Sequence, residues 1–289
     1  MEYILENKEL SIRIESFGAE LVGIKDRINE NEYIWQKNSK YWGKSSPVLF
    51  PFVGSIRNGK YQYEGKEYEI KTRHGFARDN EFKIFNRGKD FIEFVFEYSK
   101  NTLEIYPFKF KLFIKYTLKD RSLEINYRIN NLGEKEMYFS FGAHPAFNIN
   151  LDLDNNYEDY CIEFDKNEIG NSKVLQEGFV VPNKEKEIFK EKKLNLKKDI
   201  FINDALIFEN VKSKLIYLKN KKNEEIIKFK FANFEYLAFW GVQGGNFICF
   251  EPWDGITDYI NSSGKLKEKI GIRKLESNKE KKYDIMITV

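Results

Sequence analysis

Alternation of apolar and polar residues recurs along the chain and constrains its fold more than any other feature. Four segments rich in β-branched and aromatic residues carry it most clearly, at 91–98, 108–116, 123–129 and 226–231. Because successive side chains of a β-strand point to opposite faces, each segment is predicted to be a strand with one apolar and one polar face. Segments with a helical period are hard to find.

Short turns that contain Gly or Asn separate the predicted strands. They lie at residues 58–59, 64–65, 131–133 and 244–245. Such turns join antiparallel neighbours, and half-apolar strands bury their apolar faces when one sheet packs against another. The sequence therefore predicts an all-β fold of large, packed antiparallel sheets.

Nothing in the sequence divides the 289 residues into parts, since it has no Pro- or Ser-rich linker and no internal repeat. Apolar residues make up 42% of the chain and aromatic residues 16%, which is enough for a sizeable core. We therefore expect one domain over residues 1–289. The most charged stretch, residues 183–198, mixes both signs and is interpreted as a solvated hairpin or loop.

The charge pattern argues against several kinds of partner. The 48 basic and 45 acidic residues are interspersed and leave a net charge of +3, unlike a surface that follows nucleic-acid phosphates. No long apolar run is present, and the first fifteen residues include Glu2, Glu6, Lys8, Glu9, Arg13 and Glu15. We expect a soluble, cytoplasmic protein with no signal peptide, membrane span or nucleic-acid partner.

The two cysteines, Cys161 and Cys249, lie far apart in the sequence, without a CxxC motif or a nearby histidine at metal-ligand spacing. Neither a zinc site nor a redox pair is indicated. Both are interpreted as reduced residues that pack like small apolar side chains. No metal is predicted.

The chain has only two histidines, and imidazole is the side chain that exchanges protons most readily near neutral pH. His144 lies in the string SFGAHPAFN, residues 140–148. Pro145 disfavours helix at residue 144, so the imidazole is expected at a strand end, and the small Gly142 and Ala143 leave room for a ligand. A core histidine bonded to a backbone carbonyl is the alternative for this motif taken alone.

His74 lies in the string TRHGFAR, residues 72–78, between Arg73 and Arg78. The two positive charges oppose its protonation and favour a neutral ring that hydrogen-bonds. This environment suits a binding role better than that of an acid. Arg78 has a structural alternative as the partner of Asp79.

A third string, FEPWDGITD at residues 250–258, sets Glu251 directly after the apolar strand predicted at 246–250. Burial beside Trp253 and Cys249 would raise the basicity of this carboxylate, as a general base requires. The flat face of Trp253 suits the C–H face of a sugar ring. A purely structural role remains open for Glu251 taken alone.

Six strings in a fixed order, rather than any one of them, resemble a known family. They are FPFVG (50–54), NGKYQYEGKEY (58–68), HGFAR (74–78), HPAFN (144–148), NDALIF (203–208) and EPWDGITD (251–258). In this order they are similar to the aldose 1-epimerase (galactose mutarotase) family, and most similar to its LacX-like branch. The resemblance covers nearly the whole chain.

The resemblance implies a large antiparallel β-supersandwich and an enzyme, an isomerase that interconverts the α and β anomers of a hexose. It implies that His144 is the acid that protonates the ring oxygen and that Glu251 is the base that deprotonates the anomeric hydroxyl. His74 and Asp204 would hydrogen-bond the sugar. No cofactor is implied, the expected partner is a small sugar, and the chain is expected to be a monomer or a homodimer.

One departure from the family concerns the arginine that usually follows the FPxVG string and contacts the sugar. Ser55 occupies this position here, and the nearest arginine is Arg57. Residues two apart on a strand point to the same face, so Arg57 is predicted to reach the site.

Two alternatives to an aldose 1-epimerase remain open. The first is a hexose-6-phosphate 1-epimerase, in which Arg57, Arg73 and Arg78 would hold the phosphate, since guanidinium groups match its geometry. The second is a sugar-binding protein of the same fold without turnover, because a fold by itself does not determine function.

Overall fold

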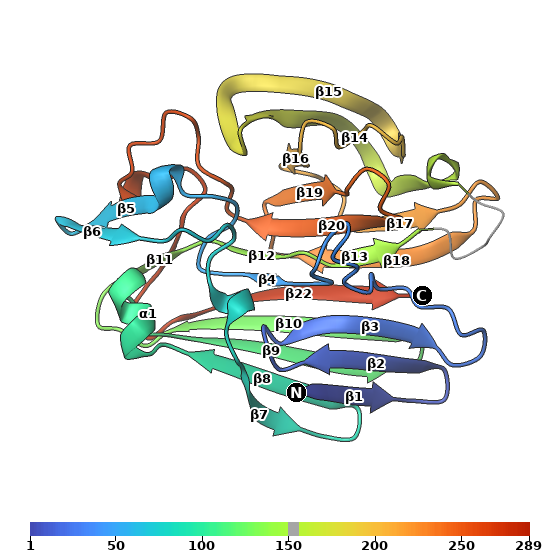
Figure 1. Ribbon diagram of the computed structural model, residues 1–289, viewed down its shortest axis with the longest axis horizontal. Coiled ribbons are helices and arrows are strands. Elements are labelled where there is room, and N and C mark those ends of the chain that lie inside the picture. Colours follow the sequence, from blue (N-terminus) through green and yellow to red (C-terminus); the bar gives the residue numbers. More distant parts are fainter. Residues whose placement is uncertain (150–155) are drawn as a thin grey trace.

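A computed structural model, which describes residues 1–149 and 156–289, has antiparallel β-sheets as its main component (Figure 1). The described strands of the largest sheet follow the order β4-β12-β20-β19-β16-β14-β17-β18-β22-β10-β9-β8-β7, with β13 beside β20 and β15 beside β14. Neighbouring strands run antiparallel throughout. The predicted all-β fold is confirmed.

The strands of this main sheet are β4 (Val48–Leu49), β7 (Lys83–Arg87), β8 (Phe91–Glu97), β9 (Phe110–Lys119), β10 (Ser122–Asn131), β12 (Phe141–Ala143), β13 (Ala146–Asn148), β14 (Cys161–Gln176), β15 (Phe179–Asn195), β16 (Leu206–Glu209), β17 (Leu215–Lys219), β18 (Glu225–Ala232), β19 (Tyr236–Trp240), β20 (Phe247–Asp254) and β22 (Glu280–Thr288). Smaller sheets contain β1 (Glu2–Glu6), β2 (Leu10–Glu15) and β3 (Glu20–Asp26), the pair β5 (Lys60–Tyr63) and β6 (Lys66–Glu69), and the pair β11 (Met137–Phe139) and β21 (Arg273–Leu275). The helical segments are α1 (Lys100–Ile105) and the 3₁₀ turns η1 (Arg57–Gly59), η2 (Ala77–Asp79), η3 (Tyr157–Asp159) and η4 (Leu266–Glu268).

The alternating segments form the strands that the sequence predicts. In β8 and β10 every second side chain is buried, and all of these side chains except Asn131 belong to one large apolar cluster. The sheet β1–β3 lies against β8–β10 (Figure 1), and the Tyr116 hydroxyl donates across the layers to the Ala19 carbonyl at 2.7 Å. The apolar faces of two layers therefore form the core, as strands with one apolar face require.

Two further predictions concern the connections. Residues 64–65 join β5 to β6 and residues 244–245 lie between β19 and β20, which confirms these two turns. The charged stretch 183–198 lies mostly in β15, the outer strand of a long, largely exposed hairpin with β14. No helix among the described residues is long and apolar enough to cross a membrane.

The predicted end of a strand at residue 250 is wrong, because β20 continues to Asp254 and Glu251 lies inside it. Pro252 has no N–H for a ladder hydrogen bond, which favours a strand end in the sequence. In the structure, the backbone side of Pro252 faces the break between β12 and β13, while Trp253 pairs with Tyr236 of β19. No strand therefore lies opposite the backbone nitrogen of Pro252, and the absence of its N–H costs no ladder hydrogen bond.

Candidate active site

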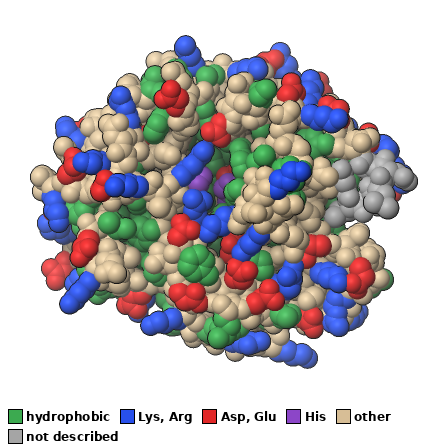
Figure 2. Space-filling model, in the orientation of Figure 1, with side chains coloured by type: hydrophobic (Ala, Val, Ile, Leu, Met, Phe, Trp, Pro, Cys, Tyr) green, Lys and Arg blue, Asp and Glu red, His purple; other side chains and the backbone are tan. Residues whose placement is uncertain are grey.

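A cleft of about 250 Å³ brings together side chains from six separate stretches of the chain. It is lined by Trp42, Arg73, His74, Arg78, His144, Asp204, Ala205, Trp240, Glu251 and Trp253. Figure 2 shows the two histidines in the hollow at the centre of this face, with basic side chains around it. Every residue that the sequence analysis predicts for the site lines this cleft except Arg57.

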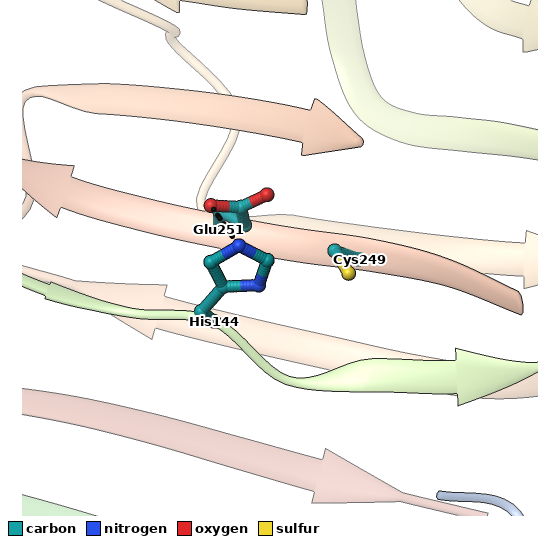
Figure 3. A group of neighbouring side chains, drawn as sticks. All are labelled: His144, Cys249 and Glu251. Atoms are coloured by element: carbon teal, nitrogen blue, oxygen red, sulfur yellow. Dashed lines mark ion pairs between the residues drawn. The ribbon is translucent and has the colours of Figure 1, made fainter. Parts of the chain in front are cut away.

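His144 and Glu251 form a buried pair, with Nε2 of the imidazole 3.1 Å from Oε2 of the carboxylate (Figure 3). His144 follows the end of β12, as Pro145 predicts, and lies in the break between β12 and β13. The Pro145 carbonyl accepts a hydrogen bond from the N–H of Phe250 at 3.0 Å. This bond fixes the break against β20 and brings the imidazole to Glu251.

Burial acts on both members of this pair in opposite directions. It raises the pKa of Glu251 well above the usual carboxyl range, and the nearby positive charge of Arg73 lowers this pKa only in part. Burial also lowers the pKa of His144 well below its usual value, and Arg78 and Arg73 lower it further. Groups held so far from their ordinary proton affinities, within hydrogen-bond distance, are suited to proton transfer.

His74 is held in one tautomer by the backbone of the FPFVG string. The N–H of Gly54 donates to Nδ1 of His74 at 3.0 Å, and the N–H of His74 donates to the Gly54 carbonyl at 2.7 Å. An imidazole that accepts at Nδ1 carries its proton on Nε2, by assignment from this hydrogen bond. The ring lies 5.7 Å from that of His144 at an interplanar angle of 85°, so both imidazoles belong to one cleft.

The environment of His74 favours the neutral form of its ring. Burial is the largest cause that lowers its pKa well below the usual value, followed by His144, Arg73 and Arg78. The direction expected from the flanking arginines is confirmed, although desolvation acts more strongly than their charge. A neutral imidazole with a fixed Nε2–H is a hydrogen-bond donor to a ligand oxygen.

Asp204 and two arginines make up the charged part of the cleft. Asp204 has a left-handed backbone (φ 84°), and its Oδ2 lies 3.4 Å from Nη2 of Arg73. Arg78 is mostly buried, and its nearest carboxylate is the exposed Asp79, at 3.6 Å from Nε. Burial lowers the pKa of Arg78. Its guanidinium therefore lines the cleft and also forms an ion pair with Asp79, the structural partner that the sequence allowed.

Arg57 is not among the residues that line this cleft. Ile56 is extended (φ −91°, ψ 132°), and the 3₁₀ turn η1 begins at Arg57. The Arg57 side chain is exposed, and its backbone N–H donates to Oδ2 of Asp258 at 2.8 Å. Arg73 and Arg78 are the arginines that line the cleft.

Two tryptophans of the cleft, Trp42 and Trp240, are absent from the sequence predictions. The Trp42 ring stacks on His144 with ring centroids 4.8 Å apart and an interplanar angle of 26°. Trp240, at the end of β19, contacts both rings edge-on. Trp42 comes from a loop about 100 residues before His144 and has no strand pattern around it, so no local signal identified it.

His144, Glu251 and Cys249 offer a nitrogen, an oxygen and a sulfur atom within 4.8 Å of one another (Figure 3). Such atoms could hold a transition metal if the sulfur were a thiolate. Cys249 is fully buried, and this burial raises the pKa of its thiol well above the usual range. The environment thus favours the protonated thiol, a poor metal ligand.

The fold and the cleft define a class, the large antiparallel β-sandwich with a polar cleft walled by aromatic rings. The sequence profile of the family described as Aldose 1-epimerase matches residues 1–270. The LacX protein encoded on a plasmid of Lactococcus lactis subsp. lactis is 32% identical over 295 residues, which cover 98% of each chain. The chain therefore belongs to the aldose 1-epimerase family.

Solved structures agree with this assignment. A galactose mutarotase-related enzyme from Lactobacillus acidophilus has a TM-score of 0.93 and 31% identity, over all of this chain and 97% of the other. A galactose mutarotase-like protein from Lactobacillus casei ATCC 334 has a TM-score of 0.92 and 25% identity, over all of this chain and 99% of the other. The predicted galactose mutarotase-like β-supersandwich is confirmed.

Proposed function

We propose that the protein is an aldose 1-epimerase, which interconverts the α and β anomers of a hexose through the open-chain aldehyde. The observation that carries the proposal is the buried contact of 3.1 Å between His144 and Glu251 inside the cleft. A protein that only binds sugar needs no matched acid and base. The family to which the chain belongs supports the same reaction.

Ring opening moves one proton off the anomeric hydroxyl and another onto the ring oxygen. With the single proton of the pair on His144, the Glu251 carboxylate, whose basicity burial raises, takes the proton from O1, and the His144 imidazolium delivers its proton to O5. The C1–O5 bond breaks, the aldehyde turns about C1–C2, and the two groups close the ring with exchanged roles. Each positioned proton transfer contributes a factor of about 10² to 10⁴.

The remaining cleft residues hold the sugar in this scheme. His74 donates a hydrogen bond from Nε2 to a hydroxyl, and Asp204 accepts one from another hydroxyl. Trp253, which lines the cleft two residues after Glu251, offers its ring to the C–H face of the sugar. All three groups orient the hexose so that its ring oxygen lies beside His144.

The decisive experiment follows mutarotation of freshly dissolved α-glucose and α-galactose by polarimetry or NMR. We expect the purified protein to accelerate the approach to anomeric equilibrium in a concentration-dependent way. Binding of either sugar without acceleration would instead support the non-catalytic alternative.

A hexose 6-phosphate is the second candidate substrate, and Arg78 is the observation that favours it. Its guanidinium lines the cleft together with that of Arg73, while its Nε is paired with Asp79 at 3.6 Å. Two arginines in one cleft suit the oxygens of a phosphate. A higher kcat/KM for glucose 6-phosphate than for glucose would establish the phosphorylated substrate.

A further inference from the structure

Trp42 covers one face of the proposed proton donor. Its ring is stacked on His144 at 4.8 Å between centroids and on Phe247 at 5.8 Å, with interplanar angles of 26° and 19°. Trp240 contacts Trp42 edge-on at 5.5 Å. The imidazole is thus held between an indole face on one side and the carboxylate of Glu251 at its Nε2 edge.

Trp42 belongs to a loop of irregular backbone, residues 37–46, which is tied down at both ends by one buried carboxylate. Oε1 of Glu20 accepts hydrogen bonds from the N–H groups of Ser45 and Ser46 at 2.6 and 3.0 Å. Oε2 of Glu20 lies 3.1 Å from Nζ of Lys37. Three partners on one fully enclosed carboxylate fix the loop at its beginning and its end.

The backbone around Trp42 is also held from within the loop. The Trp42 carbonyl accepts a hydrogen bond from Nε1 of Trp35 at 2.8 Å, and the Trp42 N–H donates to the Asn38 carbonyl at 2.9 Å. These bonds fix the backbone of Trp42, and its ring is positioned by packing against Phe247 and Trp240.

The face of an indole ring carries negative potential and attracts a cation placed over it, more strongly when water is excluded. We propose that Trp42 is a positioning residue for His144, holding the imidazole edge toward Glu251 and stabilising the imidazolium that protonates the ring oxygen. This inference rests on the proposed function. In that function, the proton shared by His144 and Glu251 lies on His144 when the sugar binds.

The other charged and titratable groups around His144 do not by themselves account for a stable imidazolium. Strand β20 contributes Glu251 and Cys249, the segment 73–78 contributes Arg73, His74 and Arg78, and the loop before β16 contributes Asp204. Both arginines oppose the imidazolium. The Glu251 carboxylate stabilises the imidazolium only after its own proton has left. The indole face of Trp42 stabilises the imidazolium whether or not Glu251 is ionised.

The test compares Trp42→Leu, which removes the ring, with Trp42→Phe, which keeps an aromatic face. For Trp42→Leu we expect kcat to fall about tenfold with little change in KM, and the basic limb of the kcat–pH profile to move about one unit lower. Trp42→Phe should restore most of kcat and of the profile. Sugar affinity and the midpoint of thermal unfolding show whether each variant keeps its fold.

A second readout does not depend on turnover. Because the chain has two histidines, ¹⁵N-histidine labelling gives signals from two imidazoles, and His74→Asn assigns them. At equal pH, we expect the His144 nitrogens of Trp42→Leu to show a smaller protonated fraction than those of the wild type with the same sugar bound. An unchanged protonated fraction and pH profile, with only KM raised, would overturn the proposal and leave Trp42 as a sugar-contacting wall.

Failure of the proposed function gives a different result. If the wild-type protein binds sugar but does not accelerate mutarotation, the epimerase assignment is wrong. If the wild type is active and Trp42→Leu is equally active with the same kcat–pH profile, only the role of Trp42 is wrong.

Discussion

Nδ1 of His74 accepts a hydrogen bond of 3.0 Å from the backbone N–H of Gly54, and this bond joins two sequence strings that lie twenty residues apart. The same two residues are joined again by the bond from the His74 N–H to the Gly54 carbonyl. A side chain that is held by the backbone at one nitrogen has only the other nitrogen left for a ligand. The proposed role of His74 in binding rests on this division.

His74→Asn tests that role, because the asparagine Oδ1 can still accept from Gly54 while the Nε2–H donor is lost. Asparagine also tolerates the left-handed backbone of this position, φ 68°. Loss of one hydrogen bond to the sugar should raise KM about tenfold and leave kcat within about threefold. Steady-state mutarotation kinetics measure both, and a large fall in kcat with normal KM would show that His74 takes part in proton transfer.

The same variant should change how stability depends on pH. His74 has a folded pKa well below its unfolded value near 6.5, so below pH 6.5 the unfolded chain binds a proton that the folded chain does not. The free energy of unfolding therefore falls as pH decreases through 6.5. For one such histidine the loss between pH 7.5 and 5.5 is about 1.4 kcal/mol.

We expect the His74→Asn variant to lose about 1.4 kcal/mol less than the wild type over this interval, because asparagine does not titrate. Urea unfolding at pH 7.5 and 5.5 gives the difference directly, and all other titrating groups cancel between the two proteins. Equal losses would mean that His74 is protonated in the folded state.

The strands and the members of the His144–Glu251 contact could be predicted from the sequence because their signals are local. Alternation within segments such as 91–98 predicts a half-buried strand whatever its neighbours, and the Ala143–His144–Pro145 string by itself predicts a strand end. The chain has only two histidines, so the sequence indicates both imidazoles of the cleft as candidates for proton exchange. The raised pKa of Glu251 follows from the apolar residues around it in the string.

The remaining features depend on contacts between distant segments. The Trp42 ring contacts His144 from a loop that Glu20 holds by hydrogen bonds. The sequence of this loop has no pattern that distinguishes it from other polar connections. Arg57 follows the extended Ile56, but the sequence spacing alone does not bring its side chain to the lining of the cleft. The continuation of β20 through Pro252 depends on a gap in a neighbouring strand.

Gly54 supports the site by its shape as well as by its N–H. It has φ 69°, and a Cβ atom built on it would lie 2.2 Å from Cβ of Thr257 in the EPWDGITD string. Gly54→Ala therefore combines left-handed strain with overpacking and should lower the unfolding free energy by about 3 kcal/mol.

Gly264→Ala is the matched control for this variant. Gly264 has φ 75°, but nothing lies within 4 Å of the added Cβ, so only the backbone strain of about 1 kcal/mol applies. Urea unfolding curves should rank Gly54→Ala clearly below Gly264→Ala. Equal destabilisation would show that the contact between the two strings tolerates a methyl group.

Glu251→Gln separates the base from its hydrogen bonds, because glutamine has nearly the same shape and cannot take a proton from the anomeric hydroxyl. We expect kcat to fall by a factor of about 10² to 10⁴, with sugar affinity within a few-fold of the wild type. Stability should be unchanged or higher, since burial already disfavours the ionised carboxyl of Glu251.

Glu168→Gln is the control, because Glu168 is also buried but accepts hydrogen bonds from Ser213, away from the cleft-lining residues. This control should lose stability and keep full turnover, so an active Glu251→Gln beside it would exclude Glu251 as the base.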